Sequence, residues 1–177
     1  MRDSLTLVAI LLGLLLGVGL GNTIFSIQTP SVSTEPPPGP VTESTLSEVT
    51  IEPIATQILQ EVNGQTTSTA SFTGDLVGTI NGAFVAEFVF TIEPNGVFEG
   101  VGYLTCNCTV DGRSGTLIER YTLVGGAGPQ GEVVSRGTWE IVRGTSELSS
   151  LRGGGTFEST RFPGELEMGT KTGRIQF

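Results

Sequence analysis

Few residue types in this chain could do chemistry, because the sequence contains no histidine. That absence excludes Ser-His-Asp and Cys-His catalysis, HExxH metalloproteases and zinc sites with imidazole ligands. We attribute the presence of a single lysine, Lys171, to genomic bias. We expect no cofactor and no metal site. Enzyme activity stays open, and a non-catalytic role is favoured. Charged side chains are more often solvated or ion-paired than catalytic. We interpret five of them in this way: Glu119, Arg120, Glu140, Arg152 and Glu158.

The two cysteines, Cys106 and Cys108, lie two apart in a predicted strand, so their side chains share one face. Two soft ligands are too few for a structural metal site. The favoured interpretation is two buried free thiols that pack as small apolar groups. A disulfide across a bulge is the alternative, although a bridge between residues i and i+2 closes a strained ring.

Two short motifs carry little weight. Asn107-Cys108-Thr109 is an N-x-T sequon that faces away from the cysteines, so Asn107 could be glycosylated in an extracellular domain. Residues Gly126 to Gly131 match G-x-G-x-x-G, but Pro129 interrupts the motif and a strand follows it. A dinucleotide site needs a helix there, so we interpret this segment as a loop.

Alternating apolar and polar residues predict strands from Thr67 to the C-terminus. Glycine makes up 26 of the 177 residues, roughly double the usual ~7%, and favours turns, bulges and strongly bent strands. Asn81-Gly82 and Asp111-Gly112 are typical of two-residue hairpins. The sequence predicts an all-β fold: a single antiparallel β-barrel of seven or eight strands.

Aromatic residues supply the bulk that could fill or line such a barrel. An eight-stranded barrel is about wide enough to be filled by side chains or to hold one small ligand. A filled core is the default for aromatics in strands. If a ligand is bound, the candidate contacts are Phe88, Tyr103, Tyr121 and Trp139.

The sequence divides into two N-terminal segments and one predicted domain. Residues 1–25 hold the apolar run Leu5 to Gly21, a membrane anchor or a signal segment. Residues 26–48 are a Pro/Ser/Thr-rich linker that cannot build a core. The β-barrel domain is expected over residues 49–177, with a short N-terminal helix that could plug one end. This helix is predicted after Pro53 by helical spacing of four apolar residues and by a C-cap at Asn63-Gly64: Ile54, Ile58, Leu59 and Val62.

The net charge of −9 argues against nucleic acid and anionic headgroups as partners. Arg2 is the only cation before the apolar run, and the next one is Arg113. This bias places the N-terminus inside and the domain outside the cytoplasm. We therefore expect a single-pass protein of the cell membrane, or a secreted domain if the segment is a cleaved signal.

The stretch Arg136 to Phe157, RGTWEIVRGTSELSSLRGGGTF, joins a strand, a short turn-rich link (the knuckle) and a glycine-rich strand. With the turn at Gly112 to Thr116 and the ending from Thr172, it resembles the DUF3224 family, whose members look like small β-barrels of the allene oxide cyclase type. In the knuckle, Ser146 and Ser150 replace glycines of the family pattern. Leu148 and Leu151 are expected to dock on the barrel.

The resemblance implies a fold more than an activity. Together with the N-terminal membrane segment and the aromatic residues, it suggests an extracytoplasmic, membrane-tethered and non-catalytic module that binds a small apolar ligand or serves as a surface module. The alternative is an isomerase or cyclase that acts on a hydrophobic substrate inside the barrel.

Overall fold

The computed structural model describes residues 42–177, and it describes side chains from Ser47 onward. The predicted anchor or signal segment, residues 1–25, and the linker up to residue 41 lie outside the described residues. The linker was expected to run to residue 48, but residues 42–48 already belong to the first strand. No helix within residues 42–177 has both the length and the apolar character needed to cross a membrane.

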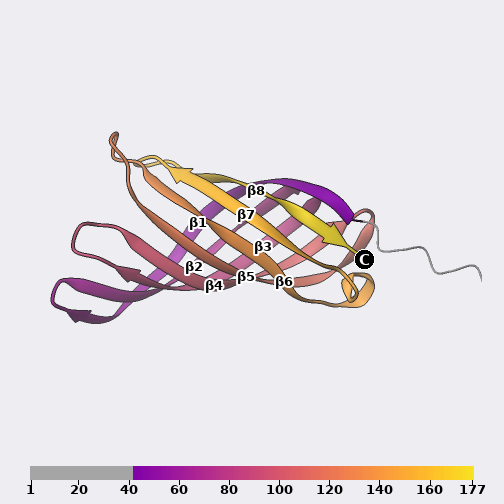
Figure 1. Ribbon diagram of the computed structural model, residues 1–177, viewed down its shortest axis with the longest axis horizontal. Helices are drawn as coiled ribbons and strands as arrows, with labels where there is room; N and C mark the ends of the chain where they lie inside the picture. The colour runs from indigo at the N-terminus through magenta and orange to yellow at the C-terminus, as the bar shows by residue number, and fades with distance from the viewer. Residues whose placement is uncertain (1–41) are drawn as a thin grey trace, which may run out of the picture. The chain divides into compact units, whose positions relative to one another are not determined.

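The described residues form eight antiparallel strands and one short 3₁₀ helix. Each strand pairs with the next along the chain, and the last pairs with the first, so a single sheet closes into a ring (Figure 1). This confirms the predicted all-β antiparallel architecture. The elements are β1 (Thr42–Val62), β2 (Gln65–Gly78), β3 (Ile80–Ile92), β4 (Phe98–Val110), β5 (Arg113–Ala127), β6 (Val133–Gly144), η1 (Ser146–Leu148), β7 (Arg152–Arg161) and β8 (Glu167–Gln176).

The predicted helix after Pro53 is wrong, because these residues form the second half of β1. Register shifts at Pro53/Ala55 and Ile58/Gln60 break the period of two, so bulges imitate helical spacing. Asn63 and Gly64 have φ values of 53° and 81° and make a two-residue hairpin turn rather than a helix C-cap. Pairing with the threonine-rich β2 therefore decides the structure of this segment.

The two predicted hairpin turns have different outcomes. Asp111 and Gly112 do connect β4 to β5, with φ values of 49° and 73°. Asn81 and Gly82 lie inside β3 instead, and β2 ends at Gly78. A Cβ at Gly82 would stand 2.1 Å from the carbonyl oxygen of Asn107 on β4, so this glycine permits a close approach of two strands.

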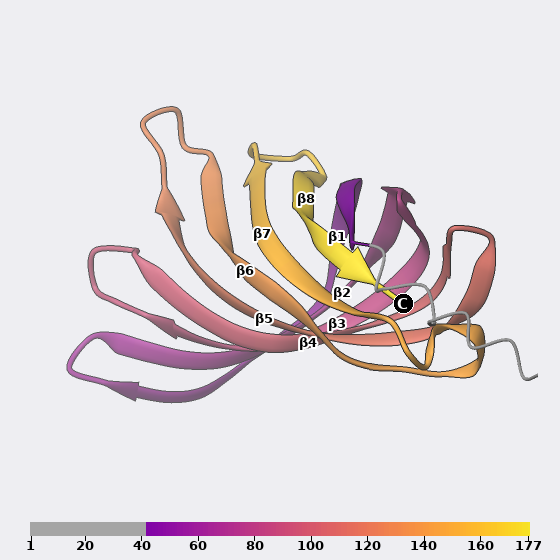
Figure 2. The ribbon, with the colours of Figure 1, turned by 45° about the vertical axis from the view of Figure 1, so that its right-hand side comes forward.

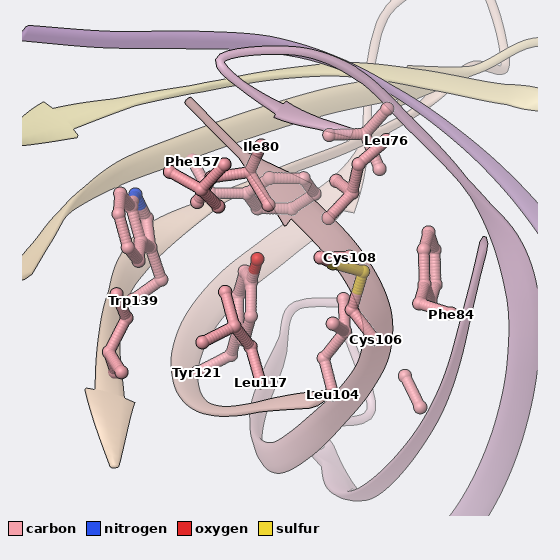
Figure 3. Close-up of a cluster of buried hydrophobic side chains, with 14 of the residues drawn as sticks. Leu76, Ile80, Phe84, Leu104, Cys106, Cys108, Leu117, Tyr121, Trp139 and Phe157 are labelled. Carbon is pink, nitrogen blue, oxygen red and sulfur yellow. A yellow bond between two sulfur atoms is a disulfide. The ribbon is translucent and has the colours of Figure 1, made fainter. Parts of the chain in front are cut away.

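One end of the ring, which we call the closed end, is filled by side chains. Leu148 of η1 and Leu151 are fully buried there, which confirms that the knuckle docks on the sheet. Two hydrogen bonds join the residue before η1 to β5: the Thr145 amide donates to the Thr116 carbonyl (3.0 Å), and the Thr116 amide donates to the Thr145 hydroxyl (3.0 Å). Figure 3 shows part of the buried cluster, which includes Leu76, Ile80 and Leu117.

The opposite end, which we call the open end, carries the β1–β2, β3–β4, β5–β6 and β7–β8 turns. The pairing of β1 with β8 ends at Ile51 and Glu167, whereas the pairing of β1 with β2 continues to Val62 and Gln65. The second half of β1 therefore extends past the ring with only β2 beside it (Figure 2).

Candidate functional site

A cavity of about 240 Å³ lies inside the ring toward the open end. Its inner wall is buried and includes Phe84, Leu104 and Tyr121, whereas Pro53 and Thr56 at its outer edge are exposed. Aromatic rings dominate the wall and meet mostly edge to face. Centroid distances are 5.9 Å for Phe72–Phe88, 5.7 Å for Phe90–Phe98 and 5.6 Å for Tyr121–Phe157. Such a wall suits an apolar molecule.

Glycines on neighbouring strands make room for these rings. Gly102 and Gly100 of β4 stand directly across from Phe88 and Phe90 of β3. A Cβ at Gly102 would lie 2.5 Å from the Phe88 ring, and one at Gly100 would lie 2.6 Å from the Phe90 ring. The rings therefore lie over bare backbone, and the same pairing recurs for Phe98 across from Gly125. This is one physical reason for the high glycine content.

Behind the cavity wall lies a buried polar cluster of four side chains: Glu119 and Tyr121 of β5, Trp139 of β6 and Lys171 of β8. The Lys171 ammonium forms an ion pair with the Glu119 carboxylate, and neither side chain is exposed to solvent. The Tyr121 hydroxyl donates to Glu119 Oε2 at 3.1 Å. Lys171 Nζ stands 3.9 Å from the centre of the Trp139 ring, within reach of a cation–π interaction.

Burial sets the protonation behaviour of this cluster. Loss of hydration raises the pKa of Tyr121 well above its ordinary value, and the charge of Glu119 and the hydrogen bond to it add to the increase. Tyr121 therefore remains a hydrogen-bond donor. Burial lowers the pKa of Lys171, while the Glu119 carboxylate acts in the opposite direction. The arrangement is a closed set of interactions in which each charged group faces its partner.

Two further charged side chains line the cavity where it opens. Arg161 ends β7 and Glu167 begins β8, both on the inward faces of their strands and both partly buried. The Ser159 hydroxyl donates to Glu167 at 2.5 Å. Within residues 47–177 the Arg161 guanidinium forms no ion pair with Glu167 or any other carboxylate within 4.0 Å.

The structure separates the four predicted ligand contacts. Phe88 and Tyr121 line the cavity. Trp139 is buried but lies outside the cavity lining, against Lys171. Placing Tyr103 in the interior is wrong, because it lies on the outer face of β4 and is 52% exposed. Strand alternation explains this, since the inward positions of β4 are occupied by its even-numbered residues, from Gly100 to Val110.

The cysteines and the sequon lie on β4, near the closed end. The favoured interpretation of two free thiols is wrong, because Cys106 and Cys108 form a disulfide in the buried cluster (Figure 3). Their Cα atoms are 5.4 Å apart, within the range that a disulfide tolerates. Asn107 lies on the outer face as expected, where its side-chain oxygen accepts a hydrogen bond from Thr116 (3.0 Å). Its glycosylation stays a prediction.

Sequence reasoning missed the most unusual interior groups. Glu119 was interpreted as a solvated or ion-paired charge, and it is ion-paired, but neither its burial nor that of Lys171, which was attributed to genomic bias, was predicted. The ion pair of Arg120 with Glu140 at 2.8 Å, half exposed, is the kind that was expected. A signal was present, because Glu119 shares a face of β5 with Leu117 and Tyr121. A carboxylate on an apolar face demands a buried partner.

Within residues 42–177 no group of three or more His, Cys, Asp or Glu side chains is placed to hold a metal ion. The wall of the cavity is mostly apolar, and its polar lining residues include the buried Ser68 and Ser135 as well as the partly buried Arg161 and Glu167.

The family model described as "Protein of unknown function (DUF3224)" matches residues 47–166 of the chain. Among solved structures, the chain is similar to a protein of unknown function from the DUF3224 family of Shewanella oneidensis MR-1, determined by crystallography at 1.84 Å resolution. The two are 15% identical with a TM-score of 0.53, and the match covers 76% of this chain and 96% of that chain. No curated protein matches. At this identity the likeness concerns the fold alone.

Proposed function

Since this chain belongs to the DUF3224 family, for which no function is known, we propose one from its interior: it is a β-barrel that binds a small apolar ligand without transforming it. The observation that carries the proposal is the aromatic cavity of about 240 Å³. This volume lies below the ~300–1,000 Å³ of drug-sized sites. It exceeds the roughly 150 Å³ of an engineered apolar cavity that binds benzene. The ligand is therefore small, about one ring with a short substituent.

The cluster behind the wall supports binding over catalysis. An isomerase or cyclase needs a proton donor or acceptor in contact with its substrate. Tyr121 is the member of the cluster that lines the cavity, but its hydroxyl is engaged by Glu119. Lys171 and Glu119 are enclosed and paired with each other. These groups are engaged with one another rather than with the cavity, which favours the binding role over the catalytic one.

Native mass spectrometry of the purified protein tests the proposal, followed by titration with neutral ethylbenzene monitored by calorimetry. Ala86, a buried residue of the cavity wall, offers a variant that fills the space: Ala86→Leu should abolish binding. Ala83→Leu on the same strand faces solvent and should bind as the wild type does. Thermal unfolding of both variants shows whether they are folded. A wild-type protein that binds no apolar probe would end the proposal.

We also propose that the N-terminal apolar segment, residues 5–21, holds this domain outside the cytoplasm. The proposal rests on the charge bias around that segment, with Arg2 before it and no cation again until Arg113. Protease added to intact cells should release a fragment by cutting between Pro30 and Thr45. A domain protected until the cells are lysed would contradict this location.

A further inference from the structure

We propose that the mouth of the cavity selects a carboxylic acid: Arg161 binds the carboxylate, and the aromatic chamber takes an apolar body about the size of one ring. The inference rests on the proposed binding function and adds the chemical class of the ligand. Three observations support it: the position of Arg161 in the cavity lining, the absence of an ion-pair partner for its guanidinium among residues 47–177, and the hydrogen bond that Glu167 accepts.

Arg161 follows Phe157 and Ser159 on the inward face of β7, whose alternation directs all three side chains to the interior. Phe157 and Ser159 are buried and Arg161 is partly buried. Arg161 is the one cation among the described residues that line the cavity. A guanidinium at this position stands where the apolar chamber meets solvent, as the head of an amphipathic ligand would.

The guanidinium has five N–H donors in a planar fork that matches the two oxygens of a carboxylate. Within residues 47–177 it makes no ion pair and no side-chain hydrogen bond. The two fully buried charges among the described residues, Lys171 and Glu119, are paired with each other. Arg161 therefore lines the cavity with donors that no other described residue uses.

The interactions of Glu167 indicate which charge the ligand should carry. It stands across from Arg161 at the end of the β7–β8 ladder, one position beyond Thr160 and Met168. Its carboxylate accepts a hydrogen bond from Ser159 at 2.5 Å, which holds it against β7. Glu167 already accepts a hydrogen bond from Ser159, whereas Arg161 has no ion-pair partner among residues 47–177. The ligand group that would complete the site is therefore an anion that pairs with Arg161.

Calorimetric titration at pH 7 with three matched probes tests the inference: 3-phenylpropionate, the neutral 3-phenylpropanamide and the cationic 3-phenylpropylamine. We expect the acid to bind about tenfold more tightly than the amide, the range of one charge-assisted hydrogen-bonded pair. Arg161→Gln should remove that preference, so that the acid binds no more tightly than the amide. Arg136→Gln, on the outer face of β6, should alter nothing.

Equal affinity for acid and amide, or a preference that survives in Arg161→Gln, would overturn the carboxylate inference and leave the apolar binding function intact. A preference for the amine that Glu167→Gln abolishes would also overturn it, because Glu167 would then be the recognition group. If none of the three probes binds, the binding function itself fails and the inference fails with it. Thermal unfolding of each variant shows that a loss of affinity is not a loss of fold.

Discussion

At the scale of single residues, the buried pair of Glu119 and Lys171 is the costliest feature of the interior. Taking two charges out of water is expensive, and their attraction offsets this only if the geometry and the remaining hydrogen bonds are good. Tyr121 donates to the carboxylate and Trp139 lies against the ammonium, so both charges have a second partner. The pair fixes the position of β8 relative to β5 from across the ring, because a misplaced strand would leave a charge alone.

Removing one member of this pair should be far worse than removing both charges. We expect Lys171→Met to lower the free energy of unfolding by ~3–5 kcal/mol, since it leaves the Glu119 carboxylate buried without its cation. The double variant Lys171→Met with Glu119→Gln should recover much of this loss, because a glutamine still accepts the Tyr121 hydrogen bond. Urea unfolding of the wild type, the two single variants Lys171→Met and Glu119→Gln, and the double variant measures the coupling. A double variant no more stable than Lys171→Met would contradict the ion-pair explanation.

The Tyr121 phenol should make stability fall at alkaline pH. Its pKa is raised in the folded state, so its contribution is fully present below about pH 10 and is lost as the pH rises toward the folded pKa. In this window the unfolded chain ionises the phenol while the folded chain keeps the proton. A Tyr103→Phe variant has Tyr121 as its single tyrosine, and its phenolate absorbance should appear well above pH 10. Titration near pH 10 with the fold intact would show that the phenol is not buried.

At the scale of elements, cross-strand pairs of an aromatic with a glycine shape the cavity wall. Phe88 lies over Gly102 and Phe90 lies over Gly100, so the ring of one strand covers the bare backbone of the next. The position is tight for backbone as well, since a Cβ at Gly102 would stand 2.3 Å from the carbonyl oxygen of Glu87. The glycines on these strands are therefore packing residues rather than turn residues.

Gly102→Ala should destabilise the protein by about 1–3 kcal/mol, the usual cost of overpacking, because either the Phe88 ring or the β3 backbone must move. Gly126→Ala on β5 is the matched control, since a Cβ there would meet nothing closer than 3.6 Å. Thermal unfolding compares the two variants with the wild type. Equal stability of Gly102→Ala and Gly126→Ala would show that the Phe88 ring and the β3 backbone can move aside without lowering the free energy of unfolding.

The second half of β1 is an edge strand, with four aliphatic side chains 48–63% exposed: Ile54, Ile58, Leu59 and Val62. Only β2 pairs with it beyond Ile51, so its other edge offers free backbone groups. Pro53 and the two register shifts interrupt that edge, as protected edges commonly are.

Because these side chains bury little, Ile58→Thr with Leu59→Thr should change the free energy of unfolding by no more than about 0.5 kcal/mol. The same change should reduce association at high protein concentration, measured by sedimentation velocity. A loss of stability well beyond that range would show that the exposed half of β1 packs against something in the folded protein.

At the scale of the whole molecule, closure of the ring depends on residues that precede the expected domain boundary. The domain was expected to begin at residue 49, but Thr42–Ile51 of β1 pair with β8 and complete the ring. Ser47 is buried in this segment, where its hydroxyl donates to the Ile80 carbonyl and accepts from the Ile80 amide, both at 3.1 Å. The first ten residues of β1 are thus structural.

A chain shortened to begin at Glu52 should therefore unfold at a clearly lower temperature than one that begins at Thr42. It would lose the pairing that closes the ring and leave β8 and the Gly74–Gly78 end of β2 with open edges. Circular dichroism should show strand structure in the longer chain and a broadened transition in the shorter one. Identical unfolding of the two chains would mean that β1 does not close the ring.

The sequence alone determined the fold class and the strand-rich region, because period-two alternation and turn residues are local signals. The docking of Leu148 and Leu151 was predicted from the knuckle that carries the family resemblance. Phe88 and Tyr121 were chosen as candidate ligand contacts because they are aromatic, and both line the cavity. Strand alternation, applied to β4, would have excluded Tyr103. What it could not give was the structure of the second half of β1, since bulges mimic a helical period until the pairing with β2 is known.

Tertiary structure alone decided the site. Glu119 and Lys171 are 52 residues apart and meet only because β8 and β5 face each other across a closed ring. Arg161 and Glu167 are an ordinary pair of opposite charges in the sequence, and only the ring shows that both face an apolar cavity while staying apart. Local patterns report the direction of a side chain, whereas its partner depends on which strands the closure brings together.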